Sequence, residues 1–250
     1  MTKSAFSEFR LIRLDEVEST NNYATSLLAS EKVEEGTVIL TFRQTHGRGY
    51  SKNVWESEDF KNLTFSLILL PRFLPASDQF LISQAVSLGL ADFLQSKTDG
   101  VSIKWPNDLL IDNKKVAGIL IENIVSGLNL YTSVIGIGIN INQTLFNGHL
   151  PHATSLSLVT GRQYPLTETL NLIIGEIMKW YKLLKEDHAG TIQKTYLDHL
   201  FRIGEKSGFL REDQVFEAQI MGIDEYGQLL LKDSSGKTEA YPFKSVEMIY

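Results

Sequence analysis

The chain contains no cysteine among its 250 residues. Disulfide bonds, thiolate metal sites and a cysteine nucleophile are therefore excluded, which fits a reducing compartment such as the cytoplasm. Long apolar runs are also missing, since the longest, residues 67–70, is far too short to span a bilayer. The N-terminus carries Glu8 and lacks the apolar stretch of a secretory signal. We therefore expect a cytoplasmic protein with no membrane partner.

Positive charge is in deficit, because 24 Lys and Arg stand against 30 Asp and Glu, a formal net charge of −6. General affinity for nucleic acid needs a basic face, so no nucleic-acid partner is expected. A helix-turn-helix pattern ahead of the main domain is also missing, because a strand begins at about residue 9. The five histidines show no metal-ligand spacing, and the chain has neither low-complexity tracts nor internal repeats.

Hydrophobic spacing divides the chain into two parts. Up to Gly204, strand-like segments are combined with amphipathic helices. The predicted strands are 9–14, 37–42, 63–70, 101–105, 109–111, 116–122 and 130–139, and the predicted helices are 19–29, 77–96, 166–184 and 191–201. Beyond Gly204 the predicted strands are short, at 215–220, 229–232 and 238–241. We expect an α+β domain over residues 1–204, with a mixed β-sheet and helices packed around it, and a small β-barrel domain over residues 205–250.

The run Lys-Trp-Pro-Asn-Asp at residues 104–108 is the most informative stretch, because nothing in the packing of a strand or helix requires this order. Its tryptophan offers a flat ring on which a base can stack. Asn107 suits phosphate or a metal, and Asp108 suits Mg²⁺, which takes one or two carboxylates plus phosphate oxygens. Lys115 follows the predicted turn at 112–114, from where its side chain can point back to the same site. The alternative is a hairpin with a structural tryptophan and an exposed lysine.

Three other segments have two interpretations each. Residues 44–55 are polar, aperiodic and contain Gly-Arg-Gly at 47–49, which suits either a loop that closes over an anionic ligand or an ordinary surface loop. Residues 136–140 end a strand with alternating glycines, which indicate close approach of a ligand or tight sheet packing. No helix follows them, so they are not a dinucleotide fingerprint. Ser-Thr-Asn at 19–21 is either a plain helix N-cap or a helix start that offers N–H groups to a ligand.

Together these segments resemble the biotin protein ligases. Four family elements are present in family order: Ser-Thr-Asn, a Gly-Arg-Gly loop closed by Trp, Lys-Trp-Pro-Asn-Asp followed by Lys and Gly-Ile-Leu, and a glycine-rich strand before Asn. They are matched by residues 19–21, 47–49 with Trp55, 104–108 with Lys115 and 118–120, and 136–140. The resemblance spans about residues 9–142. More loosely, the tail is similar to the family's small SH3-like C-terminal domain.

The resemblance implies a two-step reaction. Biotin and Mg–ATP would give biotinyl-5′-AMP and pyrophosphate, and biotin would then pass to a lysine of a biotin carboxyl carrier protein. Lys115 and Arg48 would be catalytic, because cations must offset the repulsion between two anions, and Asp108 would lie near Mg²⁺. The implied biotin contacts are Ser19, Thr20, Asn21, Gln44, Arg48, Gly49, Tyr50, Lys115 and Gly118. The implied ATP or adenylate contacts are Arg48, Trp55, Lys104, Asn107 and Asn140.

Two departures from the family pattern matter. The strand before Ser19 begins at about residue 9, which leaves no room for the winged-helix DNA-binding domain of many members, so a ligase without repressor function is expected. The loop often reads Gly-Arg-Gly-Arg, but this chain has Tyr50 at the second Arg position, which puts retention of the adenylate in question.

Three rival functions are a lipoate–protein ligase of the same fold, a biotin-binding regulator without catalysis, and a plain interaction module. The Gly-Arg-Gly loop and the β-rich tail favour biotin, and the set of catalytic candidates favours an enzyme. The sequence leaves open whether the protein is a monomer or a homodimer.

Overall fold

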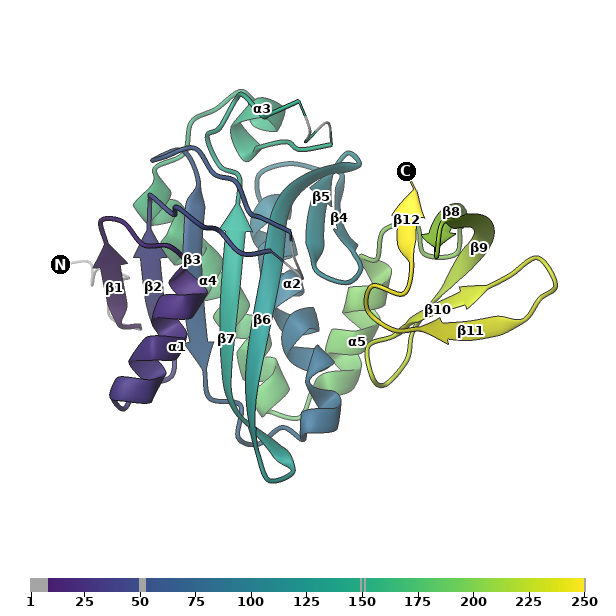
Figure 1. The fold of residues 1–250 in the computed structure, drawn as a ribbon, viewed down its shortest axis with the longest axis horizontal. Coiled ribbons are helices and arrows are strands. Elements are labelled where there is room, and N and C mark those ends of the chain that lie inside the picture. Colours follow the sequence, from purple (N-terminus) through teal and green to yellow (C-terminus); the bar gives the residue numbers. More distant parts are fainter. Residues whose placement is uncertain (1–8, 50–52, 149, 151, 250) are drawn as a thin grey trace.

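A central seven-stranded sheet organises most of the molecule (Figure 1). The computed structural model describes residues 9–49, 53–148, 150 and 152–249. The strands are β1 Leu11–Leu14, β2 Thr37–Thr41, β3 Leu63–Leu69, β4 Val101–Lys104, β5 Asp108–Ile111, β6 Lys114–Ser126 and β7 Asn129–Ile139. Their order is β1-β2-β3-β7-β6-β5-β4. β1 is parallel to β2 and the other neighbours are antiparallel, which confirms the predicted mixed sheet.

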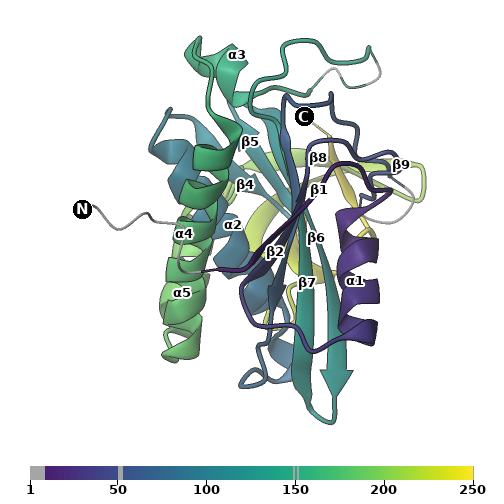
Figure 2. The same cartoon turned by 90° about the vertical axis from the view of Figure 1, so that its left-hand side faces the viewer.

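Helices cover both faces of this sheet, as the turned view in Figure 2 shows. α1 (Thr20–Ser30) lies on one face, and α2 (Phe80–Gln95), α4 (Leu166–Lys185) and α5 (Ala189–Asp198) lie on the other. β3 is buried along its whole length, as expected for a strand covered on both faces. α2 and α4 pack so closely that a Cβ on Gly89 would lie 2.5 Å from the Cα of Ile177. The backbone of α4 therefore occupies the space that a side chain at position 89 would need.

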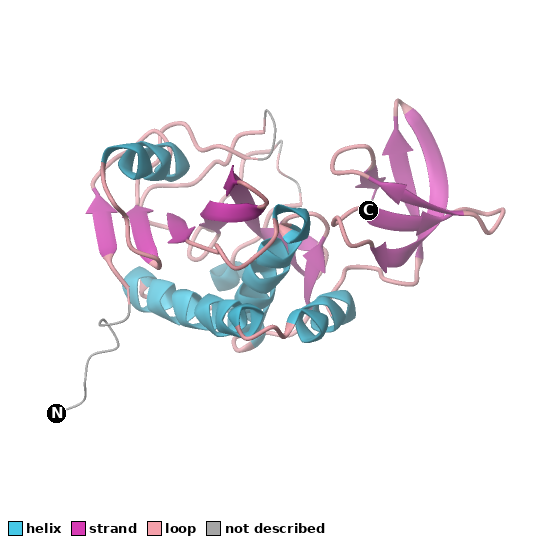
Figure 3. Ribbon diagram, turned by 90° about the horizontal axis from the view of Figure 1, so that it is seen from below, coloured by secondary structure: helices cyan, strands magenta, loops and turns pink. Residues whose placement is uncertain are grey.

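The C-terminal residues form a second sheet beside the first, seen from below in Figure 3. Its strands are β8 Lys206–Arg211, β9 Gln214–Ile223, β10 Leu229–Lys232, β11 Thr238–Tyr241 and β12 Glu247–Ile249, in the order β11-β10-β9-β8-β12. All pairings are antiparallel. Within the described residues, no hydrogen-bonded ladder joins β11 to β12, so the sheet stays open where a closed barrel was expected.

Aromatic side chains fasten this second sheet to the first. The Trp105 ring is 9% exposed and lies 5.4 Å, centre to centre, from the Phe243 ring, and its Nε1 donates to the carbonyl oxygen of Gly227 at 2.9 Å. Gly227 has φ of 85° and is so close to Phe80 that a Cβ would lie 2.5 Å from Cγ of that ring. Trp105 therefore has a structural role between the two sheets. Its ring also lines the cleft described below, so its stacking against a base stays a prediction.

The long elements agree with their predicted positions to within a few residues. The differences are in short elements: β8, β12, the helix α3 (Leu156–Thr160) and a 3₁₀ turn at Ala76–Asp78 were not predicted. β12 has three residues and α3 has five, which is too short for a hydrophobic period to be visible. β8 begins at Lys206, close to the boundary expected at residue 205.

Candidate active site

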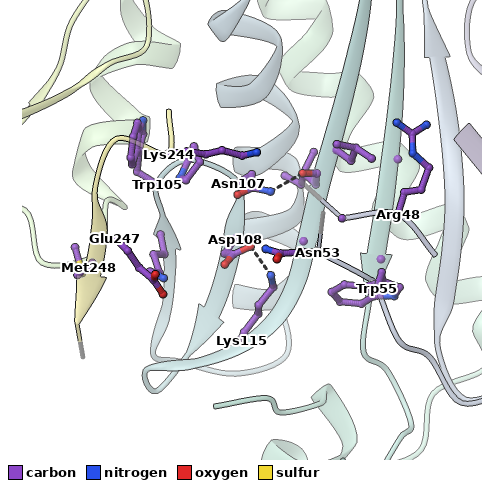
Figure 4. A pocket seen from close by; sticks show the side chains of 18 of the residues that line it. Arg48, Asn53, Trp55, Trp105, Asn107, Asp108, Lys115, Lys244, Glu247 and Met248 are labelled. Atoms are coloured by element: carbon purple, nitrogen blue, oxygen red, sulfur yellow. Dashed lines mark hydrogen bonds and ion pairs between the residues drawn. The ribbon is translucent and has the colours of Figure 1, made fainter. Parts of the chain in front are cut away.

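A cleft of about 680 Å³ opens between β6 and β7, the 44–55 segment, the 104–108 segment and the C-terminal sheet (Figure 4). Most residues that the sequence predicted for a site line this one cleft. They are Ser19, Thr20, Asn21, Gln44, Arg48, Gly49, Trp55, Lys104, Asn107, Asp108, Lys115 and Gly118. Tyr50 lies outside the described residues. Asn140 is described but does not line the cleft.

The start of α1 forms a buried polar wall. Ser19 caps the helix, since its side chain accepts from the backbone N–H of Asn22. The side-chain oxygen of Gln44 accepts from the backbone N–H of Thr20 at 2.9 Å, so a second chain segment binds the same helix end. Below it, the Ser66 hydroxyl lies 2.8 Å from Thr20 Oγ1 and 2.6 Å from Asn21 Oδ1. These bonds fix the side chains of Thr20 and Asn21 before a ligand arrives.

The 44–55 segment forms a narrow hairpin in its described part. The Gly49 N–H donates to the Asn53 carbonyl at 2.8 Å, and the Trp55 N–H donates to the Gly47 carbonyl at 3.0 Å. A Cβ on Gly47 would lie 2.2 Å from the carbonyl oxygen of Trp55, so the close approach of the two arms requires glycine. The predicted loop is confirmed in the described residues, since no helix or strand is found between β2 and β3 there, and its two arms are joined by an isolated bridge between Arg48 and Val54.

Two facing glycines hold the ring of Trp55. Gly118 on β6 and Gly138 on β7 are cross-strand partners. A Cβ on Gly138 would lie 2.2 Å from Trp55 Cε2, and one on Gly118 would lie 3.3 Å from Cζ3. Gly136 makes room for Asn21 in the same way, since its Cβ would lie 2.4 Å from Asn21 Oδ1. Gly136 and Gly138 thus allow close approach of side chains of the chain itself. Both glycines also line the cleft, so a ligand contact there stays a prediction.

Cations and carboxylates alternate on the other side of the cleft. Lys115 Nζ lies 2.7 Å from Asp108 Oδ1, with side chains 36% and 17% exposed. Burial lowers the pKa of Lys104 below its ordinary 10.5. The negative charges of Asp108 and Glu247 raise this pKa and the positive charge of Lys115 lowers it, but burial has the largest effect. Asn107 Nδ2 donates to the Ile119 carbonyl at 2.8 Å, which joins the 104–108 segment to β6. This cluster agrees with the expectation that Lys115 points back to the Lys-Trp-Pro-Asn-Asp run.

Arg48 has protein partners that the sequence did not indicate. Its Nη2 lies 2.7 Å from Glu122 Oε1, its Nη1 lies 3.3 Å from Glu122 Oε2, and Nη1 also donates to Asn22 Oδ1 at 2.7 Å. Glu122 was missed because it stands on a long strand among apolar residues, where a lone carboxylate is normally solvated.

The C-terminal sheet also contributes charged residues that the sequence interpretation missed. Arg211, Lys244 and Glu247 line the cleft, and Figure 4 shows Lys244 and Glu247 on the side opposite Arg48. Charged residues next to short strands look like ordinary surface positions in a sequence. Their role becomes visible only when the second sheet is docked through Trp105.

In the described part of the chain, no group of three or more His, Cys, Asp or Glu side chains is found that could hold a metal ion. Asp108 is a single carboxylate that is already paired with a lysine.

Of the helices described, none is long and apolar enough to cross a membrane.

Comparison with known proteins gives this cleft its context. Residues 14–140 match the Biotin/lipoate A/B protein ligase family. The bifunctional ligase/repressor BirA of Bacillus subtilis is 32% identical over 237 residues, covering 92% of this chain and 72% of that protein. A biotin–[acetyl-CoA-carboxylase] ligase of Paracoccus denitrificans is 30% identical, covering 90% of this chain and 95% of its own length. The chain belongs to this family, as a biotin protein ligase.

Solved structures agree with this membership. The biotin protein ligase of Aquifex aeolicus in complex with biotin and ATP is 27% identical, with a TM-score of 0.80 and coverage of 96% of this chain and 98% of that one. The apo form of the same Aquifex protein gives a TM-score of 0.74. The predicted fold class of the ligase is thus confirmed: a mixed sheet with helices and a separate C-terminal antiparallel sheet.

Asn140 has a different place in the ligase from the other predicted site residues. It is 4% exposed, and its Nδ2 donates to the Thr154 carbonyl at 3.0 Å. Its backbone N–H donates to the Val116 carbonyl, next to Lys115. Asn140 therefore supports the strand that carries Lys115, and its adenylate contact stays a prediction.

Proposed function

We propose that the ligase joins biotin to ATP as biotinyl-5′-AMP and then transfers biotin to a specific lysine of a biotin carboxyl carrier protein. The observation that carries this proposal is the meeting of Arg48, Lys104 and Lys115 in one cleft. Two anions, a carboxylate and a triphosphate, have to come into contact, and cations from three segments can offset their repulsion. The names of the Paracoccus and Aquifex relatives support biotin and ATP as the substrates.

In the first step, a carboxylate oxygen of biotin attacks the α-phosphorus of ATP. A new oxygen–phosphorus bond forms, and the bond to the β-phosphate oxygen breaks, so pyrophosphate leaves with that electron pair. Lys115 stabilises the negative charge that accumulates on the α-phosphate, and no base is needed because the carboxylate is already ionised. Mg²⁺ bound to ATP would offset phosphate charge, and Asp108 is the site carboxylate that would help to hold it.

The polar wall at α1 is the proposed biotin site. Thr20 and Asn21 are held by Ser66, and Gln44 is held by the Thr20 N–H, so these groups present fixed donors and acceptors to the ligand. Next to this wall, the Trp55 ring packs on Gly118 and Gly138. In the described part of the chain, the buried Nε1–H of Trp55 has no acceptor, so it is available to the adenylate.

In the second step, the neutral ε-amine of the acceptor lysine attacks the carbonyl carbon of the mixed anhydride. A carbon–nitrogen bond forms, the carbon–oxygen bond to AMP breaks, and AMP leaves as the phosphate anion while the amine loses its proton to water.

We propose that the C-terminal sheet, residues 205–250, acts as a second domain that completes the cleft. The cytoplasm, which contains ATP and carboxylases, is the compartment that suits this reaction.

The deciding experiment supplies the protein with ATP, Mg²⁺ and either biotin or lipoate and detects the acyl-adenylate by mass spectrometry. Biotinyl-5′-AMP is expected with biotin, and streptavidin blotting should then detect transfer to a carrier domain. Lipoyl-5′-AMP in place of biotinyl-5′-AMP would assign the chain to lipoate. Tight biotin binding without any adenylate would identify a regulator and refute the proposal.

A further inference from the structure

Glu122 binds the one arginine of the 44–55 hairpin through a forked ion pair. Both terminal nitrogens of the Arg48 guanidinium reach the carboxylate, Nη2 at 2.7 Å and Nη1 at 3.3 Å. Such two-point pairing fixes the orientation of the arginine as well as its distance. The side chains are 44% and 35% exposed, so water screens the pair but does not separate it.

The position of Glu122 on β6 makes this contact an anchor for the hairpin. Residues 118, 120 and 122 lie on the same face of the strand, because successive residues of a strand point to opposite faces. Gly118 contacts the Trp55 ring and Glu122 binds Arg48, so the two arms of the hairpin meet the same strand four residues apart. The hairpin is therefore held on the sheet at two points, one apolar and one ionic.

The same carboxylate also reaches the biotin wall. Asn21 Nδ2 donates to Glu122 Oε2 at 2.9 Å, and Arg48 donates to Asn22 Oδ1 at 2.7 Å. A single side chain on β6 thus connects the hairpin to the first turn of α1. Both terminal nitrogens of Arg48 have partners here, so this side chain connects the hairpin to β6 and to α1.

We propose that Glu122 is a positioning residue that acts through Arg48 to hold the hairpin over the cleft and so sets how long the ligase retains biotinyl-adenylate. The proposal rests on the proposed function. Glu122→Gln keeps an oxygen for Asn21 and nearly the same volume, but it removes the charge that binds Arg48.

The test is a pulse-chase of preformed biotinyl-adenylate on four proteins: the parent, Glu122→Gln, Arg48→Gln and the double variant. We expect release from Glu122→Gln to be about two- to fivefold faster, as loss of a half-exposed forked pair implies. The rate of the first adenylation turnover should fall by less than this. In the Arg48→Gln background the Glu122 change should have no further effect, because its partner is already gone.

Glu31→Gln is the matched control, since Glu31 pairs with Arg10 at 3.2 Å with similar exposure, 44% and 46%, but does not line the cleft. It should leave the release rate unchanged. An unchanged release rate in Glu122→Gln, or equal effects of that change with and without Arg48, would overturn the proposal.

Failure of the proposed function gives a different result, because then the parent protein makes no biotinyl-adenylate at all. Tryptic cleavage after Lys52 in the ligand-free protein tests the anchor independently of the reaction. Faster cleavage in Glu122→Gln than in the parent and in Glu31→Gln supports the anchor, and equal cleavage in all three refutes it.

Discussion

Replacing Lys115 by alanine is the most direct test of the proposed chemistry. Its Nζ lies 2.7 Å from Asp108 Oδ1 and 5.8 Å from the centre of the Trp55 ring, so the charge is in the middle of the cleft. A unit charge at 4 Å from a developing negative charge contributes up to about 4 kcal/mol at an effective dielectric constant of 20. Loss of one oxyanion donor in an enzyme typically slows the reaction by roughly 10²–10³-fold. We expect a reduction of this size in the rate of adenylate formation.

The stability of the fold should change little in the same variant. The Lys115 side chain is 36% exposed, and an ion pair of this exposure contributes about 1 kcal/mol or less. Asp108 also keeps a second cation, because Lys104 interacts with it electrostatically. Urea unfolding should therefore show a loss of at most about 1–2 kcal/mol, which separates a catalytic effect from misfolding.

The assay is single-turnover formation of biotinyl-5′-AMP, quenched in acid and measured by mass spectrometry. Lys114→Ala is the control, because Lys114 is the neighbouring residue on β6 but is exposed and does not line the cleft. It should leave the rate within about twofold. Near-normal adenylation by Lys115→Ala in a folded protein would refute the argument that this charge stabilises the transition state.

Biotin should slow proteolysis within residues 44–55, and equal cleavage with and without it would contradict ligand-induced ordering. Tyr50→Arg should slow adenylate release in a pulse-chase by about tenfold to a hundredfold, whereas an unchanged rate would mean that no further cation is needed. For Glu35, burial raises the pKa, but hydrogen bonds from Lys185 and Tyr181 outweigh it and keep the pKa below 4.5. The resulting stabilisation exists above pH 4.5 and is lost as pH falls through the lowered pKa. In Glu35→Gln, the free energy of unfolding measured with urea should therefore decrease less between neutral and acid pH than in the parent. A low-salt gel shift should show no sequence-specific DNA complex at submicromolar protein.

The sequence was informative wherever neighbouring residues determine the structure. Helical periodicity located α4 and α2, and the Ser-Thr-Asn element located the start of α1 at its cap, Ser19. Residues 104–108 and Lys115 come together because a tight β5–β6 hairpin brings Asp108 opposite Gly118. A short hairpin of this kind can be predicted from a turn and two apolar runs.

Contacts between distant residues were beyond prediction. Glu122 binds Arg48 from 74 positions away, and Trp105 donates to Gly227 from 122 positions away. Neither contact leaves a local pattern, because each needs the packed sheets to bring its partners together. For the same reason the sequence analysis assigned the rare motif wholly to a ligand, although one of its members, Trp105, also fixes the second sheet.

The cleft explains how an acidic chain can bind two anions. Its cations are not free in the structure: Lys115 faces Asp108, Arg48 faces Glu122, and Lys104 interacts with Asp108 and Glu247. Such pairs lower the cost of gathering positive charge in a partly dry cleft, where burial already lowers the pKa of Lys104. Under the proposed function, phosphate oxygens then replace carboxylates around Lys104 and Lys115, which are already in position. The Arg48 pair differs from the other two, because it would persist in the adenylate complex and keep the hairpin on β6. Glu122 should therefore affect adenylate release more than adenylate formation.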